Sequence, residues 1–225
     1  SEVACTHVAA VVGTYSNTAT GDSAETAAVT SNTVSTTVTD PAPVCLPPEF
    51  PDVQESHAFF NEICWMVDAG ITDGYQDGTF KPGNPVTRQA MAAFLQRLSG
   101  EPTPGDCTRQ FTDVSTAHPF FDEICWMVGQ EITNGYLDGT FRPGANVSRA
   151  AMAAFLYRFE GPLTFSPPIA ATFPDVGTAH PFFEEVEWMV DEGITGGFPD
   201  NTYRPASNVT RQSMAAFLFR LTHPA

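Results

Sequence analysis

Apolar side chains recur at helical spacing in two neighbouring segments of the chain. The first stripe has a period of 3.6 residues and consists of Phe59, Phe60, Ile63, Met66 and Val67. The second stripe falls at positions i, i+3, i+4 and i+7 and consists of Met91, Phe94, Leu95 and Leu98. The pattern therefore predicts two amphipathic helices joined by a loop. Thr87 precedes the second helix and is suited to be its N-cap.

The whole helix–loop–helix segment occurs three times. The copy that opens at Phe50 returns at Phe111 and again at Phe173, with spacings of 61 and 62 residues. A unit of this length cannot bury its apolar face alone, so the copies are expected to share one core. We predict a mainly α fold whose repeats span residues 44–100, 101–161 and 162–225.

Glycines mark the end of the first helix in two of the three copies. Gly70 and Gly193 are suited to a left-handed C-terminal cap. Glu131 occupies the same position in the second copy, where the sequence predicts a different arrangement.

Residues 1–43 differ in character from the repeats. They contain no Lys or Arg, and Val8–Tyr15 and Ala27–Val38 are rich in β-branched residues with partial alternation. This composition fits either weak strands or a disordered stalk. Prolines at 41, 43, 47 and 48 mark the boundary. No apolar run reaches about 18 residues and no signal peptide is visible, so we predict no membrane span and expect a mature or excised piece of a longer protein.

The charge of the chain is both high and unevenly placed. A net charge of −16 disfavours nucleic acid as a partner, because nucleic-acid-binding surfaces are basic. Ten cationic side chains are present, and all but Arg109 fall at three repeat positions. These positions are Lys81/Arg142/Arg204, Arg88/Arg149/Arg211 and Arg97/Arg158/Arg220. Such regular placement on an acidic body indicates a localised anionic ligand.

The cysteines follow the repeat as well. Cys64 and Cys125 share one helical position, and Cys45 and Cys107 lie just before repeats one and two. The third repeat lacks both cysteines, so a repeat has cysteine either at both positions or at neither. We predict disulfides Cys45–Cys64 and Cys107–Cys125 in an oxidising compartment, the alternative being reduced, buried cysteines. Cys5 is left over.

Two further repeated positions bear on chemistry. Trp65, Trp126 and Trp188 lie opposite the main apolar stripe, where they either stack on sugars or pack between helices; packing is favoured. His57, His118 and His180 could share a Zn²⁺ only if a threefold axis gathered them, and we expect them to point outward instead. The sequence predicts no metal and no cofactor.

No motif for catalysis is present. The chain has no Gly-x-Ser-x-Gly, no His-Glu-x-x-His and no Gly-rich phosphate loop. Acidic residues at Glu62, Asp122–Glu123 and Glu184–Glu185 are interpreted as a solvated helix face. A site repeated three times also favours a binder that gains avidity over an enzyme.

The repeated motifs resemble a known family. Phe-x-Asp-Val, Gly-Ile-Thr-x-Gly-Tyr-x-Asp-Gly-Thr-Phe-x-Pro and Val-Thr-Arg are similar to the S-layer homology domain, in three copies over about residues 50–222. The resemblance implies a pseudo-threefold helical bundle with grooves between repeats, which attaches exported bacterial proteins to secondary cell-wall polysaccharide, often through a pyruvate ketal. Ala90, Ala151 and Ser213 replace the Glu of the family's usual Thr-Arg-Ala-Glu, a form similar to actinobacterial versions.

The arginine after each N-cap is the main candidate for the ligand site. Unpaired N–H groups at a helix start favour an anion, and a guanidinium fork can hold a carboxylate through two hydrogen bonds. The alternative is a loop fastener paired with a neighbouring acid such as Asp52 or Asp77. The candidate ligand-binding set is Arg88, Arg149, Arg211, Thr87, Ser148, Thr210, Lys81, Arg142 and Arg204. For Lys81, Arg142 and Arg204 a solvated loop charge is an equal alternative, and Arg97, Arg158 and Arg220 are interpreted as structural.

The resemblance and the charge pattern together predict a non-catalytic, extracellular cell-wall anchoring module whose partner is acidic wall polysaccharide. The alternative is a self-assembling surface-layer or adhesin protein whose repeats bind neighbouring subunits. The sequence leaves the identity of the glycan open.

Overall fold

The structure is a computed structural model. It describes the backbone of four short strands between residues 13 and 38, and in full residues 50–103, 107, 111–162 and 164–224. The chain divides into two compact units, Ser1–Val44 and Cys45–Ala225, and each is described by itself.

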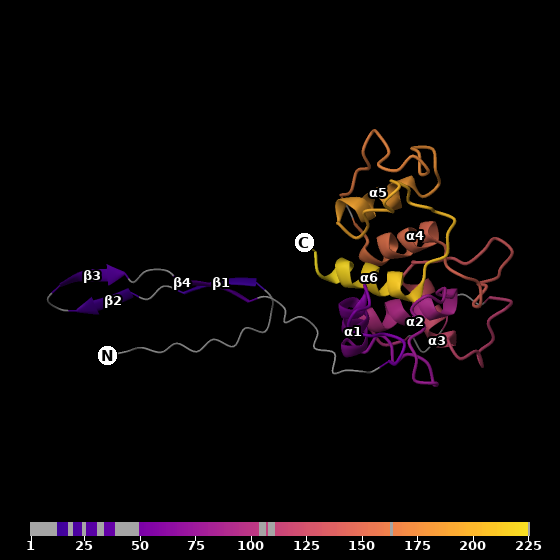
Figure 1. Cartoon of the computed structure of the whole chain (residues 1–225), viewed down its shortest axis with the longest axis horizontal. Coiled ribbons are helices and arrows are strands. Elements are labelled where there is room, and N and C mark those ends of the chain that lie inside the picture. The colour runs from indigo at the N-terminus through magenta and orange to yellow at the C-terminus, as the bar shows by residue number, and fades with distance from the viewer. Residues whose placement is uncertain are drawn as a thin grey trace. The chain divides into compact units, whose positions relative to one another are not determined.

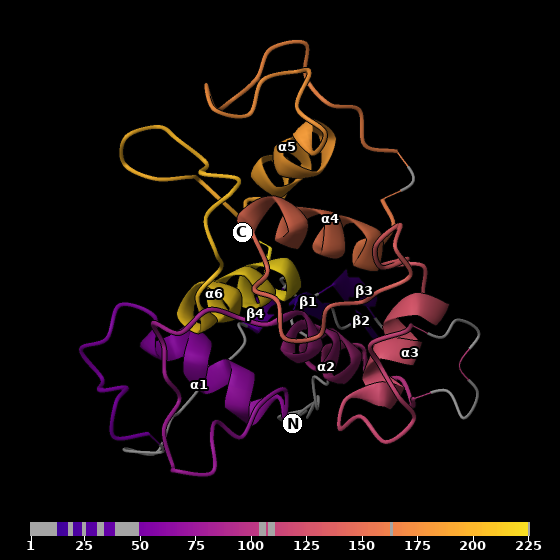
Figure 2. The same cartoon turned by 90° about the vertical axis from the view of Figure 1, so that its right-hand side faces the viewer.

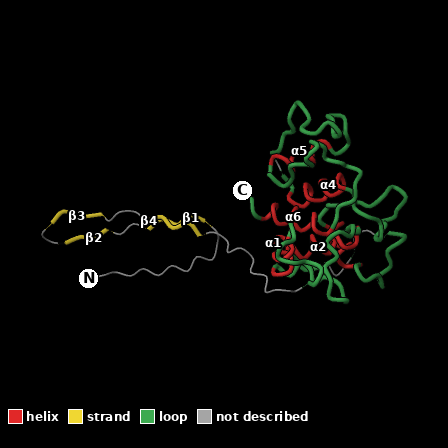
Figure 3. Tube along the Cα trace, in the orientation of Figure 1, coloured by secondary structure: helices red, strands yellow, loops and turns green. Residues whose placement is uncertain are grey.

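The first unit contains two antiparallel strand pairs (Figures 1 and 3). Strand β1 (Gly13–Asn17) pairs with β4 (Val34–Val38), and β2 (Thr20–Ser23) pairs with β3 (Thr26–Thr30). Of the two alternatives for this stalk, the described segments adopt strands.

The second unit holds the predicted helix pairs. The first helices of the repeats are α1 (Phe60–Asp68), α3 (Phe121–Gly129) and α5 (Phe183–Asp191). The second helices are α2 (Arg88–Ser99), α4 (Arg149–Glu160) and α6 (Arg211–Thr222). The side chains of Thr87, Ser148 and Thr210 each accept a hydrogen bond from the third helical N–H, which confirms the N-caps. No helix in the described residues has the length and apolar character needed to cross a membrane.

The repeats close into a ring. Helix α2 packs on α3, α4 on α5, and α6 returns to α1, and Figure 2 shows the second helices in the centre with the first helices outside them. At the centre, Val86 N–H donates to Val209 O (2.8 Å), Val209 N–H to Val147 O (2.9 Å), and Val147 N–H to Val86 O (2.9 Å). This cycle of backbone hydrogen bonds confirms the pseudo-threefold bundle.

The shared core is made by the same positions of each second helix. Met91, Met152 and Met214 are fully buried, as are Leu95, Leu156 and Leu218. A single repeat would expose these side chains, at a cost of about 2 kcal/mol each. The bundle therefore depends on all three copies.

A disulfide ties the linker to the first helix in repeat two. Cys107 and Cys125 are bonded, with their Cα atoms 5.1 Å apart, as predicted. Cys64 is disulfide-bonded too, but its predicted partner Cys45, like Cys5, lies outside the described residues. In repeat three the buried Glu187 takes the cysteine's place and accepts hydrogen bonds from the backbone N–H (2.8 Å) and hydroxyl (2.7 Å) of Thr172.

The prediction for Glu131 was wrong. Gly70 and Gly193 adopt the expected left-handed conformation, with φ of 68° in both, but Glu131 adopts it as well, with φ of 58°. Its N–H donates to Val128 O (3.0 Å), and Gly70 makes the equivalent bond to Val67 O. The backbone geometry is thus set by the repeat, and the glutamate side chain accommodates it.

Candidate functional site

Each arginine at the start of a second helix reaches into the next repeat. Arg88 Nε donates to the carbonyl oxygen of Phe141 at 2.7 Å, and only 7% of Arg88 is exposed. Arg149 Nε donates in the same way to Tyr203 O (2.7 Å) and Arg211 Nε to Phe80 O (2.6 Å). The helix that carries the arginine and the loop that receives it always belong to different repeats, so each contact is a junction between two copies.

An aromatic ring lies beside both cations of each junction. Around Tyr136, the guanidinium carbons of Arg88 and Arg142 lie 4.9 and 3.9 Å from the ring centroid. Arg142 also pairs with Asp138 at 2.9 Å. We call this set the Arg88 junction, made of Arg88, Tyr136, Asp138, Phe141 and Arg142.

The other two junctions repeat this arrangement. The Arg149 junction comprises Arg149, Phe198, Asp200, Tyr203 and Arg204. The Arg211 junction comprises Arg211, Tyr75, Asp77, Phe80 and Lys81. Cationic residues from two of the predicted sets therefore meet at every junction.

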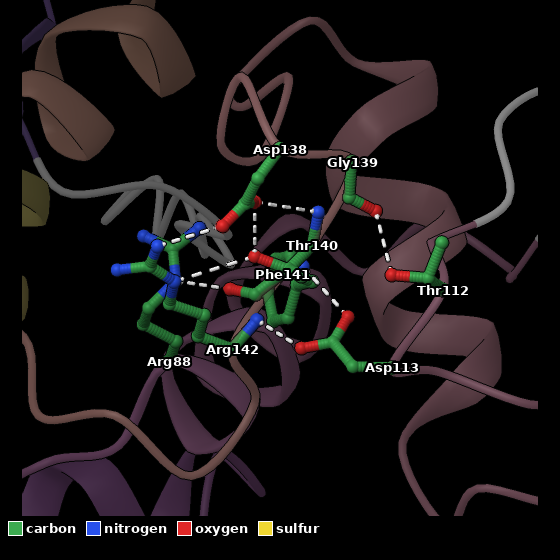
Figure 4. A network of polar contacts seen from close by, with 8 residues as sticks. All are labelled: Arg88, Thr112, Asp113, Asp138, Gly139, Thr140, Phe141 and Arg142. Carbon is green, nitrogen blue, oxygen red and sulfur yellow. Dashed lines mark hydrogen bonds and ion pairs between the residues drawn. The ribbon is translucent and has the colours of Figure 1, made fainter.

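An aspartate outside the predicted set fixes the loop at each junction. Asp113 accepts hydrogen bonds from the N–H groups of Phe141 (2.8 Å) and Arg142 (2.7 Å), as Figure 4 shows. These bonds hold Arg142 in a left-handed conformation, with φ of 58°, and aim the Phe141 carbonyl at Arg88. Asp52 and Asp175 do the same in their repeats. Their signal in the sequence is the aspartate of the repeated Phe-x-Asp-Val.

The environment makes the buried arginines unusual. Burial lowers the pKa of Arg88, Arg149 and Arg211, because taking a guanidinium out of water disfavours its charged form. The nearby Arg142 and Arg204 lower the pKa values of Arg88 and Arg149 further. The carboxylates that pair with the outer cations are instead stabilised in their charged form: hydrogen bonds from Thr140 and Arg142 lower the pKa of Asp138 to about 2.

The alternative in which a neighbouring Asp fastens each arginine is not what the structure contains. Asp77 pairs with Lys81 at 2.8 Å, and Asp52 binds backbone N–H groups. Arg211 instead donates to a backbone carbonyl of the next repeat. The arginines do fasten loops, but across the junctions between repeats and through a neutral acceptor.

One part of the predicted anion site was wrong. The first N–H groups of α2 are already paired, since Arg88 N–H donates to Ala145 O (2.9 Å) and Gln89 N–H to Pro143 O (3.0 Å). The third is satisfied by the Thr87 side chain at 3.4 Å. The same pairing recurs at α4 and α6. Thr87, Ser148 and Thr210 thus serve as caps, and the helix starts offer no free donors.

The terminal nitrogens of the arginines remain available. Among the described residues, neither Arg88 nor Arg149 makes a hydrogen bond through Nη1 or Nη2, and Arg211 makes one long contact, from Nη2 to Thr72 Oγ1 at 3.5 Å. No fully buried side-chain nitrogen in this part of the chain lacks a partner. The Nη atoms of Arg88 and Arg149 and Nη1 of Arg211 therefore reach solvent, while the rest of each side chain is held in place.

The remaining predicted positions have structural contacts. Arg97, Arg158 and Arg220 donate to the carbonyls of Ile71, Ile132 and Ile194 within their own repeats, in line with a structural role. The tryptophans pack: Trp65 lies edge-on to Phe219 and Trp188 edge-on to Tyr157, each on the preceding repeat.

The histidines lie near the start of the first helices. Nδ1 of His57, His118 and His180 accepts the N–H two residues on. Within the part of the chain that is described, no three His, Cys, Asp or Glu side chains gather as metal ligands. A cavity of about 460 Å³ beside Phe165 and Glu187 shares no residue with the junctions.

Comparison with known proteins agrees with this architecture. The sequence pattern of the S-layer homology domain matches residues 49–92, 110–153 and 172–215. The chain belongs to this family. Each match ends within the second helix of its repeat. Every S-layer homology domain therefore contains one of the three buried arginines and one loop that receives the buried arginine of another domain.

Relatives of this S-layer homology protein include surface proteins. It is 30% identical over 158 residues to a cellulosome-anchoring protein of Acetivibrio thermocellus. The aligned region covers 68% of this chain and 35% of that protein. It is 27% identical over 172 residues to an S-layer protein of Bacillus thuringiensis subsp. finitimus. The aligned region covers 75% of this chain and 21% of that protein. The chain therefore spans about a third or less of the length of these relatives.

Proposed function

We propose that this chain is a non-catalytic cell-wall anchoring module and that its junctions bind acidic groups of a wall polysaccharide. Arg88, Arg149 and Arg211 would each hold a carboxylate, such as that of a pyruvate ketal, through their Nη atoms. Lys81, Arg142 and Arg204 add positive charge beside the same site. The polysaccharide is the partner, and the location is the bacterial cell surface.

The observation that carries this proposal is the state of the three buried arginines. Each has its Nε bonded to a neutral carbonyl and lies within 4 Å of no carboxylate in the described part of the chain, where the ion pairs involve Lys81, Arg142 and Arg204. A buried cation without a counter-ion is costly, so a ligand carboxylate on the exposed Nη pair would gain a charge-assisted, bidentate contact. Because the side chain is already fixed, little conformational entropy is lost on binding.

The family and the relatives support the same proposal. The chain matches the S-layer homology domain three times, and its relatives include a cellulosome-anchoring protein and S-layer proteins. Three junctions within one bundle would also give avidity for a polymer that carries many acidic groups.

The test is co-sedimentation with cell walls of the source organism, before and after their secondary polymers are stripped by hydrofluoric acid. The unaltered chain should sediment only with intact walls. The triple variant Arg88→Lys, Arg149→Lys, Arg211→Lys keeps the charge but loses the planar fork, and should sediment at least about 10-fold less.

A matched control removes three other arginines. Arg97→Lys, Arg158→Lys and Arg220→Lys also break a hydrogen bond to a backbone carbonyl, but lie outside the junctions. This control should sediment like the unaltered chain. Equal sedimentation of both triple variants would refute the proposal, provided that circular dichroism shows both to be folded.

A second candidate is self-assembly through the repeats, which the S-layer relatives favour. Concentration-dependent assembly in the absence of wall material, measured by light scattering, would support it. If the particle size does not change with protein concentration in the absence of wall material, self-assembly is refuted and the anchoring function is favoured.

A further inference from the structure

The Arg149 junction lacks one exposed chemical group that the other two junctions share. The Arg88 and Arg211 junctions contain Tyr136 and Tyr75, whereas the Arg149 junction contains Phe198. The rings occupy the same place: the Phe198 centroid lies 4.8 Å from the Arg149 guanidinium and 4.0 Å from that of Arg204, against 4.9 and 3.9 Å for Tyr136 and its two arginines. The substitution therefore removes a hydroxyl and leaves the geometry unchanged.

The two hydroxyls are free to meet a ligand. Tyr75 and Tyr136 are 39% and 36% exposed, which places them among the most exposed large apolar side chains in the described residues. Neither hydroxyl makes a hydrogen bond to another described residue, although both rings are held by two cations. A fixed phenol beside a fixed guanidinium presents a donor and acceptor next to a carboxylate site.

The Arg149 junction carries a different hydroxyl, and this one is used internally. Tyr203 replaces the phenylalanines Phe80 and Phe141 of the other repeats, is fully buried, and donates its O–H to the backbone carbonyl of Arg149 at 2.9 Å. Arg149 Nε in turn donates to the Tyr203 carbonyl. These reciprocal bonds tie repeats two and three together more tightly than a single bond does.

On the basis of the proposed function, we infer that the junctions are not equivalent and that Tyr75 and Tyr136 contact the ligand. The ligand is a sugar that bears a carboxylate and a neighbouring hydroxyl. Its carboxylate binds the arginine Nη groups, and its hydroxyl forms a hydrogen bond with the tyrosine O–H. The Arg88 and Arg211 junctions are the two strong sites. The Arg149 junction, which lacks the exposed hydroxyl, mainly fastens repeats two and three.

The experiment is isothermal titration of the whole chain with short wall-polysaccharide fragments released by hydrofluoric acid. We expect two strong sites in the unaltered chain. The double variant Tyr75→Phe, Tyr136→Phe loses one hydrogen bond in each site, which should weaken binding about 3- to 10-fold. Phe198→Tyr restores the hydroxyl at the third junction and should add a third strong site.

Two controls separate contact with the ligand from effects on the fold. Tyr157→Phe removes a hydroxyl that bonds to Glu184 outside the junctions, and should leave the titration unchanged. Tyr203→Phe removes the internal bond, and should lower thermal stability while leaving the two strong sites intact.

The outcomes distinguish this inference from the proposed function. Three equal sites in the unaltered chain, or a double tyrosine variant that binds as tightly as the unaltered chain, would overturn the inference while the arginine site stood. Failure of the unaltered chain to bind the fragments at all would overturn both.

Discussion

Arg88 Nε donates to the carbonyl oxygen of Phe141, a residue 53 positions further along the chain and in the next repeat. Because its two equivalents, Arg149 with Tyr203 and Arg211 with Phe80, follow the same rule, the three contacts run around the ring and close it. The side chain that is proposed to bind the wall polymer is thus also part of the assembly of the fold.

This double role predicts a measurable loss of stability. Arg88→Ala should lower the free energy of unfolding by about 2 kcal/mol, because it removes a charge-assisted hydrogen bond to a buried carbonyl. Arg142→Ala removes an exposed, solvent-screened ion pair and should lower the free energy of unfolding by much less. Urea denaturation measures both values, and equal losses would contradict the role assigned to Arg88.

Glu131 offers a test of backbone strain. Its φ of 58° costs a residue with a side chain about 1 kcal/mol relative to glycine, so Glu131→Gly should raise the free energy of unfolding by about that amount. Gly193→Ala, at the equivalent position with open space around it, should lower it by a similar amount. A Glu131→Gly protein no more stable than the parent would show that the glutamate is held by contacts of its own.

The disulfide of repeat two should be structural. Cys107 and Cys125 are 18 residues apart, and a loop of this length gives a cross-link worth about 3 kcal/mol. The double variant Cys107→Ser, Cys125→Ser should therefore melt at a lower temperature by differential scanning calorimetry. An unchanged melting temperature relative to the parent would contradict the prediction.

The outer ion pairs should survive well into the acid range. Hydrogen bonds from Lys81 and Thr79 lower the pKa of Asp77 from 3.8 to about 2. Because the pKa of Asp77 is lowered in the folded state, its ion pair stabilises the fold fully above about pH 3.8. This stabilisation is lost as the pH falls through about 2. Carboxyl-carbon NMR should show the Asp77 midpoint near 2, and a higher midpoint in Lys81→Met, where only the hydrogen bonds from Thr79 still lower the pKa. A midpoint near 3.8 in the unaltered chain would mean that the pair does not form.

The sequence predicts the repeat, the helices and their N-caps because these depend on local patterns. The spacing of Met91 and Leu95 is enough to predict the second helix, and the placement of Thr87 before Arg88 is enough to predict its N-cap. The Cys107–Cys125 disulfide was also predictable, since both positions are replaced together in the third repeat.

The site was only partly predictable, because its decisive contacts cross between repeats. Nothing near Arg88 in the sequence shows that Ala145 and Pro143 take the N–H groups at the start of its helix. The two cations of a junction, Arg88 and Arg142, meet only because the ring closes. The left-handed Glu131 was missed because propensity alone assigns that conformation to glycine.

Binding of a carboxylate of the wall polymer by the Nη groups of the three buried arginines can be tested directly. The most direct measurement is NMR of the side-chain guanidinium groups during titration with hydrofluoric-acid-released wall polysaccharide, alongside the same polysaccharide with its carboxyl groups reduced to alcohols. We expect the Nη–H resonances of all three arginines to shift with the acidic polymer and not with the reduced one, and those of Arg88 and Arg211 to shift most. Resonances that stay unchanged, or that shift equally with both polymers, would contradict carboxylate binding by these arginines.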